Sequence, residues 1–296
     1  MHVAQLPFSL FGPSTVLGII GLFHGGGATP AAPADDWRNA TVDLVIPAFN
    51  HQDDIVRCLA SVIRQTLRPR SIVVVDDGSS DATAARAAAF SDFHGLGVLV
   101  IKRVNSIGKT ATIRAQARTL DCDVLFVLNA DTILDSDGYL ERTVWELYRG
   151  QGIASAEGRI LPLRDADRRA LDESPEVRTF VEAFATYGPA MAPTWLRRLI
   201  SAMSRTYRHV LHRFVQRVVL RDQTAIAETI SKPSGCAVAY RRTHLEALFD
   251  VPLLGNDLTN SEDIFVGLTM LDDGYRNIEV TEINARTRAT VPSPSF

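Results

Sequence analysis

The chain has 296 residues, of which 46% are hydrophobic and 22% are charged, a composition typical of a globular protein with a substantial core. Its formal net charge is −3, so no overall positive field indicates a nucleic-acid partner. The 3 cysteines, an odd number without CxxC spacing, argue against a disulfide framework or a zinc cluster and favour a reducing, cytoplasmic compartment.

Residues 1–40 are expected to form an apolar arm followed by a linker. Val3–Phe23 contains no charged residue and is long enough to span a membrane, but prolines and glycines interrupt it and no Lys or Arg precedes it. Gly25–Asp36 has the Gly, Ala and Pro content of a linker. A membrane-associated arm and a surface-packed arm are both compatible with this segment.

The stretch Val42–Asp81 has the pattern of a strand, a helix and a second strand. Asp43–Pro47 and Ile72–Val75 are runs that suit buried parallel strands. The apolar residues between them repeat at helical spacing, and Asp53 or Asp54 is placed to cap the helix. Ligands of such sheets bind at the carboxyl ends of the strands, so the residues after each run are candidates for a site.

Strands and helices continue to alternate along the chain. Further strands are expected at Gly97–Lys102, Asp123–Leu128, Gly152–Ala156, Cys236–Tyr240 and Asn277–Thr281. Further helices are expected over Lys109–Leu120, Gly138–Tyr148 and Thr243–Phe249. Two more are expected to begin at a capping residue, one within Ser79–Asp81 and ending at Phe90, the other at Ser261 and ending at about Asp273. This order predicts a doubly wound α/β domain.

Residues 161–230 interrupt the alternation and are expected to be mostly helical. Within them, Trp195–Arg221 combines one apolar stripe with 7 arginines and has no Asp or Glu. A core-packed helix with a solvated basic face, a helix on an anionic membrane surface and a helix that holds an anionic acceptor all fit this pattern. Nucleic acid is the least favoured partner, because no aromatic residues alternate with the basic ones.

Carboxylates follow two of the expected strands. Asp76 and Asp77 could accept hydrogen bonds from a nucleobase imide or a ribose hydroxyl, although a turn and helix cap would look the same. Asp131, beside Asn129, could hold a hard divalent cation that also binds diphosphate oxygens, or could only cap the next helix.

A third acidic pair begins a helix near the end of the chain. Adjacent residues on a helix point in different directions, so one of Glu262 and Asp263 can face a site while the other fixes the loop. A carboxylate at a helix N-terminus is stabilised in its ionised form and could act as a general base. The alternative is the ordinary preference for acidic residues in a first turn.

These motifs resemble those of a known family. VIPAFN, a helix and VVVDDGSSD are similar to the opening of the inverting family 2 glycosyltransferases, which have the GT-A fold. NSIGKTATIRAQA, VLFVLNADT, KPSGCAVAYRR and EDIFVGLTMLDDGYR keep the family's order, so the resemblance covers about Thr41–Ile283. It implies a mixed, mainly parallel sheet flanked by helices, with a nucleotide-sugar-binding half at 41–160, a helical insertion at 161–230 and an acceptor and catalytic-base half at 231–296.

The resemblance also implies roles for single residues. The positions on the donor side would be Pro47, Asn50, Lys109 and Asn129 around the nucleotide sugar, Asp76 and Asp77 at the base, and Asp131 at a Mg²⁺ or Mn²⁺ ion. The positions on the other side would be the catalytic pair Glu262 and Asp263, with Asp263 as the base, and Gly235 and Arg241 lining the acceptor.

The implied reaction is a single in-line displacement that moves a sugar from a nucleotide-diphosphate donor to an acceptor hydroxyl of a carbohydrate, lipid or protein. Many relatives have Asp where this chain has Asn129, which leaves more of the metal binding to Asp131. No QxxRW motif follows the resemblance, which favours transfer of a single sugar over polymer synthesis. The alternatives are the catalytic part of a membrane-associated processive polysaccharide synthase and a catalytically idle nucleotide-sugar-binding module.

Overall fold

The computed structural model describes residues 37–150, 152–184, 229–230, 233–250 and 262–288. The apolar segment Val3–Phe23 and the basic segment Trp195–Arg221 lie outside these residues, so the expectations for both remain predictions. Among the helices that the structure describes, none is both long and apolar enough to cross a membrane.

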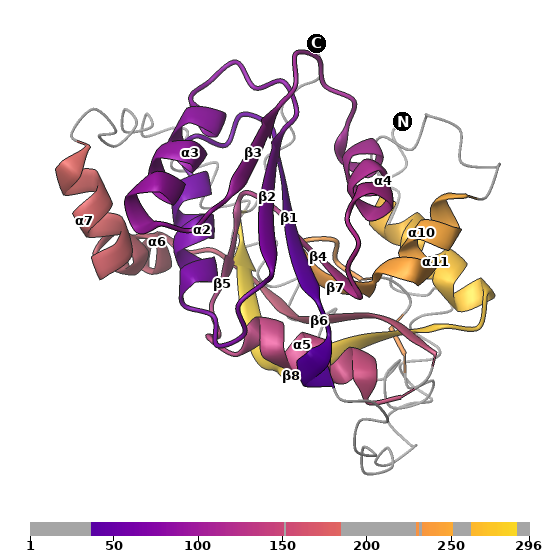
Figure 1. Cartoon of the computed structure of the whole chain (residues 1–296). Helices are drawn as coiled ribbons and strands as arrows, with labels where there is room; N and C mark the ends of the chain where they lie inside the picture. Colours follow the sequence, from indigo (N-terminus) through magenta and orange to yellow (C-terminus); the bar gives the residue numbers. More distant parts are fainter. Residues whose placement is uncertain (1–36, 151, 185–228, 231–232, 251–261, 289–296) are drawn as a thin grey trace, which may run out of the picture.

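One sheet of eight strands organises the described part of the chain (Figure 1). The spatial order of its strands is β3-β2-β1-β4-β7-β6-β8-β5. Their bounds are β1 Val42–Ala48, β2 Ser71–Asp76, β3 Leu99–Lys102, β4 Val124–Leu128, β5 Thr132–Leu134, β6 Ile153–Pro162, β7 Ala237–Arg241 and β8 Arg276–Thr287. The first four strands are parallel, β7 is antiparallel to β4 and β6, and β8 is parallel to β6.

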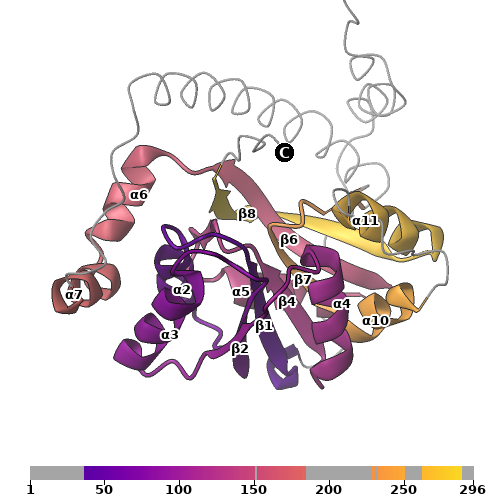
Figure 2. The ribbon, with the colours of Figure 1, turned by 90° about the horizontal axis from the view of Figure 1, so that it is seen from above.

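Helices cover both faces of the sheet (Figure 2). One face carries α2 (Ile55–Ile63), α3 (Thr83–His94) and α5 (Tyr139–Tyr148), and the other carries α4 (Lys109–Thr119), α10 (Arg242–Phe249) and α11 (Glu262–Asp272). The remaining described helices are the short η2 (Trp37–Asn39) and the pair α6 (Asp165–Asp172) and α7 (Pro175–Ala183) beside α2 and α3. This arrangement confirms the expected mixed, mainly parallel sheet flanked by helices.

The core forms two apolar layers because side chains alternate between the faces of each strand. On β4, Phe126 packs with Tyr139 of α5 on one face, whereas Leu125 and Val127 belong to the layer under α4, α10 and α11. All five residues of β4 are buried, which explains why this strand reads as a continuous apolar run.

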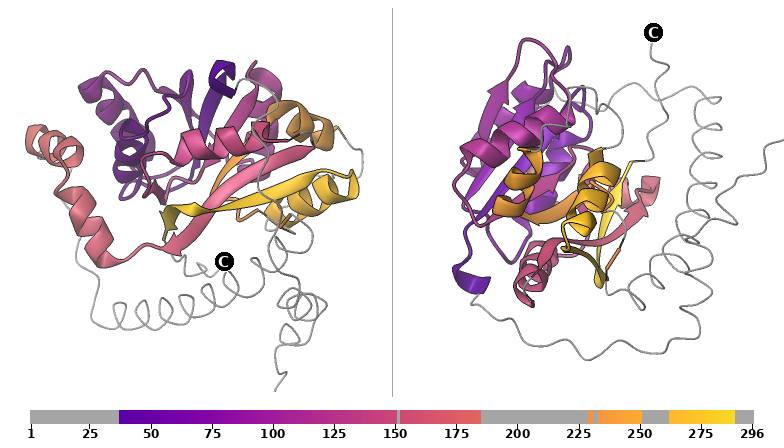
Figure 3. Two further views of the ribbon diagram at one scale, coloured as in Figure 1. Left: turned by 90° about the horizontal axis from the view of Figure 1, so that it is seen from below. Right: turned by 90° about the vertical axis from the view of Figure 1, so that its right-hand side faces the viewer.

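Three strands differ from the sequence-based expectation. β6 and β8 extend well beyond Gly152–Ala156 and Asn277–Thr281, because they pair with each other along most of their length (Figure 3). The polar residues in their second halves are stabilised as strand by that long-range pairing, which local sequence does not reveal. β5, antiparallel to β8, was not anticipated, and β6 continues to Pro162, inside the segment expected to be helical. The helices α6 and α7 follow it.

The strand β1 separates from its neighbour β4 before its own carboxyl end. Its ladder with β4 ends at Val45 and Val127, whereas its ladder with β2 continues to Ala48. Pro47 lies in the last part of β1, where it needs no partner on the β4 side. The residues after β1, β2 and β4 therefore share one edge with the loop before β7, as expected for ligand sites in such sheets.

Candidate active site

The turn after β1 is tied to the turn after β2 through Asn50. This residue has a φ of 57°, a left-handed conformation that Asn adopts more readily than most residues. Its backbone N–H donates to Ser79 Oγ at 2.8 Å, and its side-chain Oδ1 accepts from the Ser80 N–H at 3.0 Å. Asn50 therefore shapes the edge of the site, and the preceding residue, Phe49, is 51% exposed.

Asp76 is fully buried at the end of β2. Its Oδ1 accepts a hydrogen bond from the Ser79 N–H at 2.9 Å, and among the described residues none donates to its Oδ2. The next turn residue, Gly78, has a φ of 84°, and a Cβ there would lie 3.1 Å from the backbone nitrogen of Ser106. Only glycine lets the loop before α4 pack this closely against the turn.

Asp77 binds that loop, which runs over residues 103–108. Its carboxylate accepts from Arg103 Nη1 at 2.9 Å, Ser106 Oγ at 2.6 Å, the Gly108 N–H at 2.8 Å and the Ile107 N–H at 3.1 Å. Burial would raise the pKa of Asp77, but these donors outweigh it and hold the pKa below its ordinary value. A ligand that used Asp77 would have to displace donors of this loop.

Asp131 follows β4 and is buried, with 7% of its surface exposed. Its Oδ1 accepts weak hydrogen bonds from Thr132 Oγ1 at 3.3 Å and Thr287 Oγ1 at 3.4 Å. Burial raises the pKa of the Asp131 carboxyl, His51 opposes this shift, and the charge of Asp54 adds to it. The carboxylate is therefore short of positive charge, which fits a role in binding a cation.

Asp131 and Asn129 have oxygen atoms that could coordinate a divalent cation, but two residues do not complete its coordination. In the described ranges no three His, Cys, Asp or Glu side chains gather as a metal site. Asn129 holds the turn through its backbone, which donates to the Cys236 carbonyl at 2.8 Å and accepts from the Thr132 N–H at 2.9 Å. The Asp131 carboxylate and the Asn129 amide are the donor types that Mg²⁺ or Mn²⁺ prefers, with further ligands needed from substrate or water.

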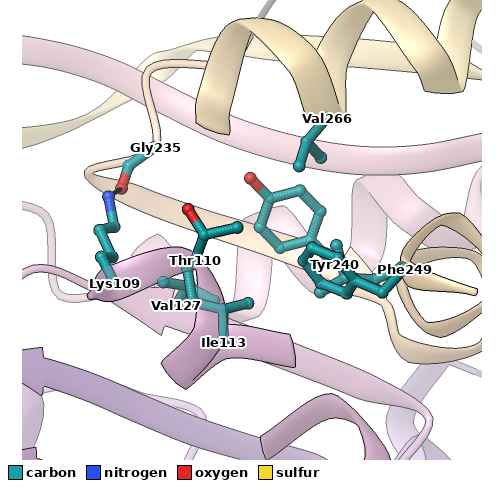
Figure 4. Close-up of a pocket in the computed structure, with 9 residues that line it drawn as sticks. Lys109, Thr110, Ile113, Val127, Gly235, Tyr240, Phe249 and Val266 are labelled. Carbon is teal, nitrogen blue, oxygen red and sulfur yellow. Dashed lines mark hydrogen bonds between the residues drawn. The ribbon is translucent and has the colours of Figure 1, made fainter. Parts of the chain in front are cut away.

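Lys109, the first residue of α4, crosses to the loop before β7 (Figure 4). Its Nζ donates to the Gly235 carbonyl at 2.8 Å. Glu157 on β6 fixes the same loop, because its carboxylate accepts from the Ser234 N–H at 2.9 Å and from Ser234 Oγ at 2.5 Å. Lys109 and Gly235, predicted for the donor and the acceptor side respectively, are thus in contact.

The crevice beside this contact is narrow and apolar. Tyr240, Phe249 and Val266 line it together with Lys109 and Gly235. Its volume of about 10 Å³ holds at most about one water molecule. Val266 lies one turn after the start of α11, so the backbone of that first turn lies close to the Lys109–Gly235 contact.

The structure does not place the predicted catalytic pair Glu262 and Asp263 in the site by their side chains, and it places Arg241 away from the site. Glu262 and Asp263 form the first turn of α11, and their side chains lie outside the described part of the structure. Arg241 lies at the far end of β7, opposite Val124 at the start of β4, where its guanidinium donates to the Leu147 carbonyl at 2.7 Å. β7 runs antiparallel to β4, so its last residue points away from the edge that carries Asp131, and the structure does not bring Arg241 to the site.

The structure adds residues that the motifs did not indicate. Asp54 occupies the N-cap position of α2, but its side chain makes no capping hydrogen bond, which corrects the expectation from the helix pattern. It instead accepts from Arg168 and Arg288, and His51 Nδ1 lies 3.9 Å from it. Burial alone would lower the pKa of His51, but the neighbouring carboxylates of Asp54 and Asp131 raise it. Asp54 was detectable only as one of two adjacent acidic residues at a helix start.

A family model supplies the decisive comparison. The model described as glycosyl transferase family 2 matches residues 43–249, which is most of the chain and includes every strand of the sheet except β8. The chain belongs to glycosyl transferase family 2. The sequence resemblance is thereby confirmed.

Individual relatives agree with this assignment. The O-antigen chain rhamnosyltransferase RfbN of Salmonella typhimurium is 31% identical over 131 residues, 44% of this chain and 40% of the relative. The undecaprenyl-phosphate 4-deoxy-4-formamido-L-arabinose transferase of Serratia proteamaculans is 30% identical over 93 residues, 30% of this chain and 28% of the relative. The matched segments thus span less than half of the length of these relatives.

A solved neighbour supports the fold. The mannosyltransferase PcManGT from Pyrobaculum calidifontis, in complex with GDP-Man and Mn²⁺, superposes with a TM-score of 0.64 over 97% of this chain and 67% of that chain, at 17% identity. At this identity the likeness shows that the architecture is shared, namely the GT-A fold.

Proposed function

We propose that this protein is a metal-dependent, inverting glycosyltransferase that moves one sugar from a nucleotide-diphosphate donor to an acceptor hydroxyl. The observation that supports the proposal most directly is that Asp77 and Asp131, at the ends of two parallel strands, share one edge of the sheet with the Lys109–Gly235 contact, beside which Val266 of α11 lies. Residues 41–160 form the donor half and residues 231–296 the acceptor half of one domain.

On the donor side, Asp76 and Asp77 recognise the base, beside Pro47 and Asn50. The donors that now occupy Asp77 are N–H and O–H groups of the loop, which a base imide or ribose hydroxyl can replace in kind. The exposed ring of Phe49 offers an apolar face next to this position.

Next to the base, Asp131 and Asn129 hold Mg²⁺ or Mn²⁺. A cation bound there would supply the positive charge that stabilises the leaving diphosphate. The raised pKa of Asp131 supports the assignment, because a nearby cation would stabilise its ionised form. Lys109 supplies a further positive charge on the diphosphate side.

On the acceptor side, Asp263 accepts the proton of the acceptor hydroxyl, while Glu262 fixes the turn. The acceptor oxygen forms its bond to the anomeric carbon as the bond to the diphosphate oxygen breaks, which inverts the configuration. Position supports this role, since the helix N-terminus favours an ionised carboxylate and Val266, one turn later, lines the crevice with Gly235.

The acceptor is a carbohydrate, a lipid or a protein. The Serratia relative is named for undecaprenyl phosphate, which supports a lipid-linked acceptor. With such an acceptor the reaction would take place at the cytoplasmic face of a membrane. The basic segment 195–221 would provide contact with an anionic surface.

Release of nucleoside diphosphate from a panel of UDP-, GDP- and dTDP-sugars, with Mg²⁺, Mn²⁺ or EDTA, tests the proposal. We expect turnover with one donor class, its loss in EDTA, and a decrease of about 10²–10⁴-fold in Asp263→Asn. Asp250→Asn is the matched control, because this exposed carboxylate pairs with Arg118 on α4, on the outside of the molecule.

Two results would contradict parts of the proposal. Full turnover in Asp263→Asn would refute the assigned base. Calorimetric binding of UDP and Mn²⁺ without product from any donor and acceptor pair would instead identify a nucleotide-sugar-binding module.

A further inference from the structure

Three arginines from different segments surround the carboxylate of Asp54. Arg57 belongs to α2, Arg168 to α6, and Arg288 follows β8. Arg168 Nη2 and Arg288 Nη1 both donate to Asp54, the latter at 3.0 Å, and Arg57 Nη1 lies 3.9 Å from it. A contact among residues 54, 168 and 288 exists only because the chain folds these segments onto one edge.

The positive charges in this cluster exceed the described carboxylates that pair with them. Arg57 is neutralised by Asp172, with Nε to Oδ1 at 2.6 Å and Nη2 to Oδ2 at 2.9 Å. Arg168 and Arg288 share the single carboxylate of Asp54, so one guanidinium charge in this group is left without a described carboxylate of its own.

The neighbouring arginine, Arg286, does not change this balance. It is paired with Asp135 at 2.9 Å and with Asp167 at 3.1 Å. A further carboxylate nearby is that of Asp131, whose own charge we assign to a metal ion.

The shared carboxylate is buried, whereas the guanidinium groups reach the surface. The Asp54 side chain is 4% exposed, and the side chains of Arg168 and Arg288 are 26% and 51% exposed. Each guanidinium has five N–H donors, and Asp54 occupies only part of them. Asp54 therefore holds two guanidinium groups side by side with donor edges available to a ligand.

The segment that carries Arg288 also contacts the proposed metal position. The backbone N–H of Arg288 donates to the Asp131 carbonyl at 3.3 Å, and Thr287 Oγ1 contacts Asp131 Oδ1 at 3.4 Å. These contacts bring the end of β8, which carries Arg288, next to the turn that carries Asp131, so the arginine pair and the proposed metal position lie on the same edge of the sheet.

We propose that Arg168 and Arg288 form an anion subsite that binds a phosphate group of a substrate. Guanidinium groups bind tetrahedral oxyanions through paired, charge-assisted hydrogen bonds, and two held together by one buried carboxylate need little further ordering. The inference rests on the proposed function for its substrates. The phosphate comes either from the donor's diphosphate or from a phosphate-bearing acceptor, and both present the same oxygens.

Binding of inorganic phosphate and pyrophosphate to the full chain, measured by calorimetry at constant ionic strength, tests the subsite without turnover. We expect Arg168→Gln and Arg288→Gln each to weaken binding by about tenfold, as loss of one charge-assisted contact predicts. Arg288→Lys keeps the charge without the planar fork, so its affinity should fall between those of the wild type and Arg288→Gln.

Arg178→Gln on α7 is the matched control, because its side chain is 61% exposed and pairs with Glu182 of the same helix. It should bind like the wild type. Equal phosphate affinity in wild type, Arg178→Gln and Arg288→Gln would overturn the proposal. Thermal melting of each variant confirms that the chain folds.

Kinetics separate the two sources of the phosphate. A higher KM for the sugar nucleotide in Arg288→Gln identifies the donor's diphosphate, whereas a higher KM for a phosphorylated acceptor alone identifies the acceptor. If phosphate binding depends on Arg288 but no sugar is transferred, the anion subsite is supported and the proposed transferase function is refuted. If sugar is transferred and Arg288→Gln changes neither KM value nor the phosphate affinity, the transferase function is supported and the anion subsite is refuted.

Discussion

Replacement of Glu279 by glutamine should make the protein more stable above neutral pH. Glu279 lies on β8 opposite Glu157 of β6 and is only 7% exposed. Burial raises the pKa of Glu279 from 4.5 to about 7, and the charge of Arg159 offsets only part of this effect. The folded protein therefore holds a proton on Glu279 that the unfolded chain has released.

The sign and the size of the effect follow from this difference. Between pH 4.5 and about 7 the folded state binds more protons than the unfolded state, so the free energy of unfolding falls as the pH rises. At about 1.36 kcal/mol per pKa unit, the full loss is about 3 kcal/mol and is complete above about pH 7. A glutamine side chain cannot ionise, so Glu279→Gln should match the wild type near pH 4 and exceed it by about 3 kcal/mol near pH 8.

Urea denaturation followed by tryptophan fluorescence, from pH 4 to pH 9, measures this difference. Glu282→Gln is the control, because this residue lies on the same strand with a side chain that is 68% exposed. Its substitution should change stability by less than about 0.5 kcal/mol at any pH. A difference between wild type and Glu279→Gln that stays constant from pH 4 to pH 8 would refute the reasoning.

Two further substitutions test the packing around the sheet by the same denaturation assay. Tyr139→Phe removes a buried hydroxyl that accepts a hydrogen bond from the Gly158 N–H at 2.7 Å and donates one to a β7 carbonyl at 2.9 Å. It should lower the free energy of unfolding by about 2–4 kcal/mol. A loss below about 1 kcal/mol would show that these groups find other partners. Phe180→Ala on α7 removes a fully buried ring in edge-to-face contact with Phe90, with ring centroids 5.2 Å apart. It should lower the free energy of unfolding by about 3–5 kcal/mol. The control is Val181→Ala on the same helix, where the side chain is 37% exposed and the loss should be less than about 1 kcal/mol. Equal effects of the two α7 substitutions would mean that this helix does not pack on α3 as described.

The site depends on the β6–β8 pair as well as on the parallel strands. β6 carries Glu157, which holds the loop with Gly235, and β8 ends at Thr287, whose hydroxyl contacts Asp131. Both halves of the proposed reaction are therefore positioned by strands that come long after β1 in the sequence. Variants in β6 or β8 would be expected to change substrate binding without touching the family motifs.

Most of the sheet and the polar residues at the ends of its parallel strands could be predicted from the sequence. Buried parallel strands such as β1, β2 and β4 need apolar side chains on both faces, so a continuous apolar run in the local sequence is enough to predict them. The residues that follow them, including Asp77 and Asp131, were indicated because the carboxyl ends of parallel strands share one edge. The resemblance to family 2 followed from the order of these motifs, and the family model confirmed it.

Other features were decided only by the tertiary structure. The full lengths of β6 and β8 depend on their pairing with each other, and the position of Arg241 away from the site depends on the antiparallel direction of β7. The partners of Asp54 come from α6 and from the residue after β8, 114 and 234 positions away. A charge pattern in sequence shows which residues can ionise, but only the folded chain determines which of them meet, because contacts between distant segments are set by packing and not by local propensity.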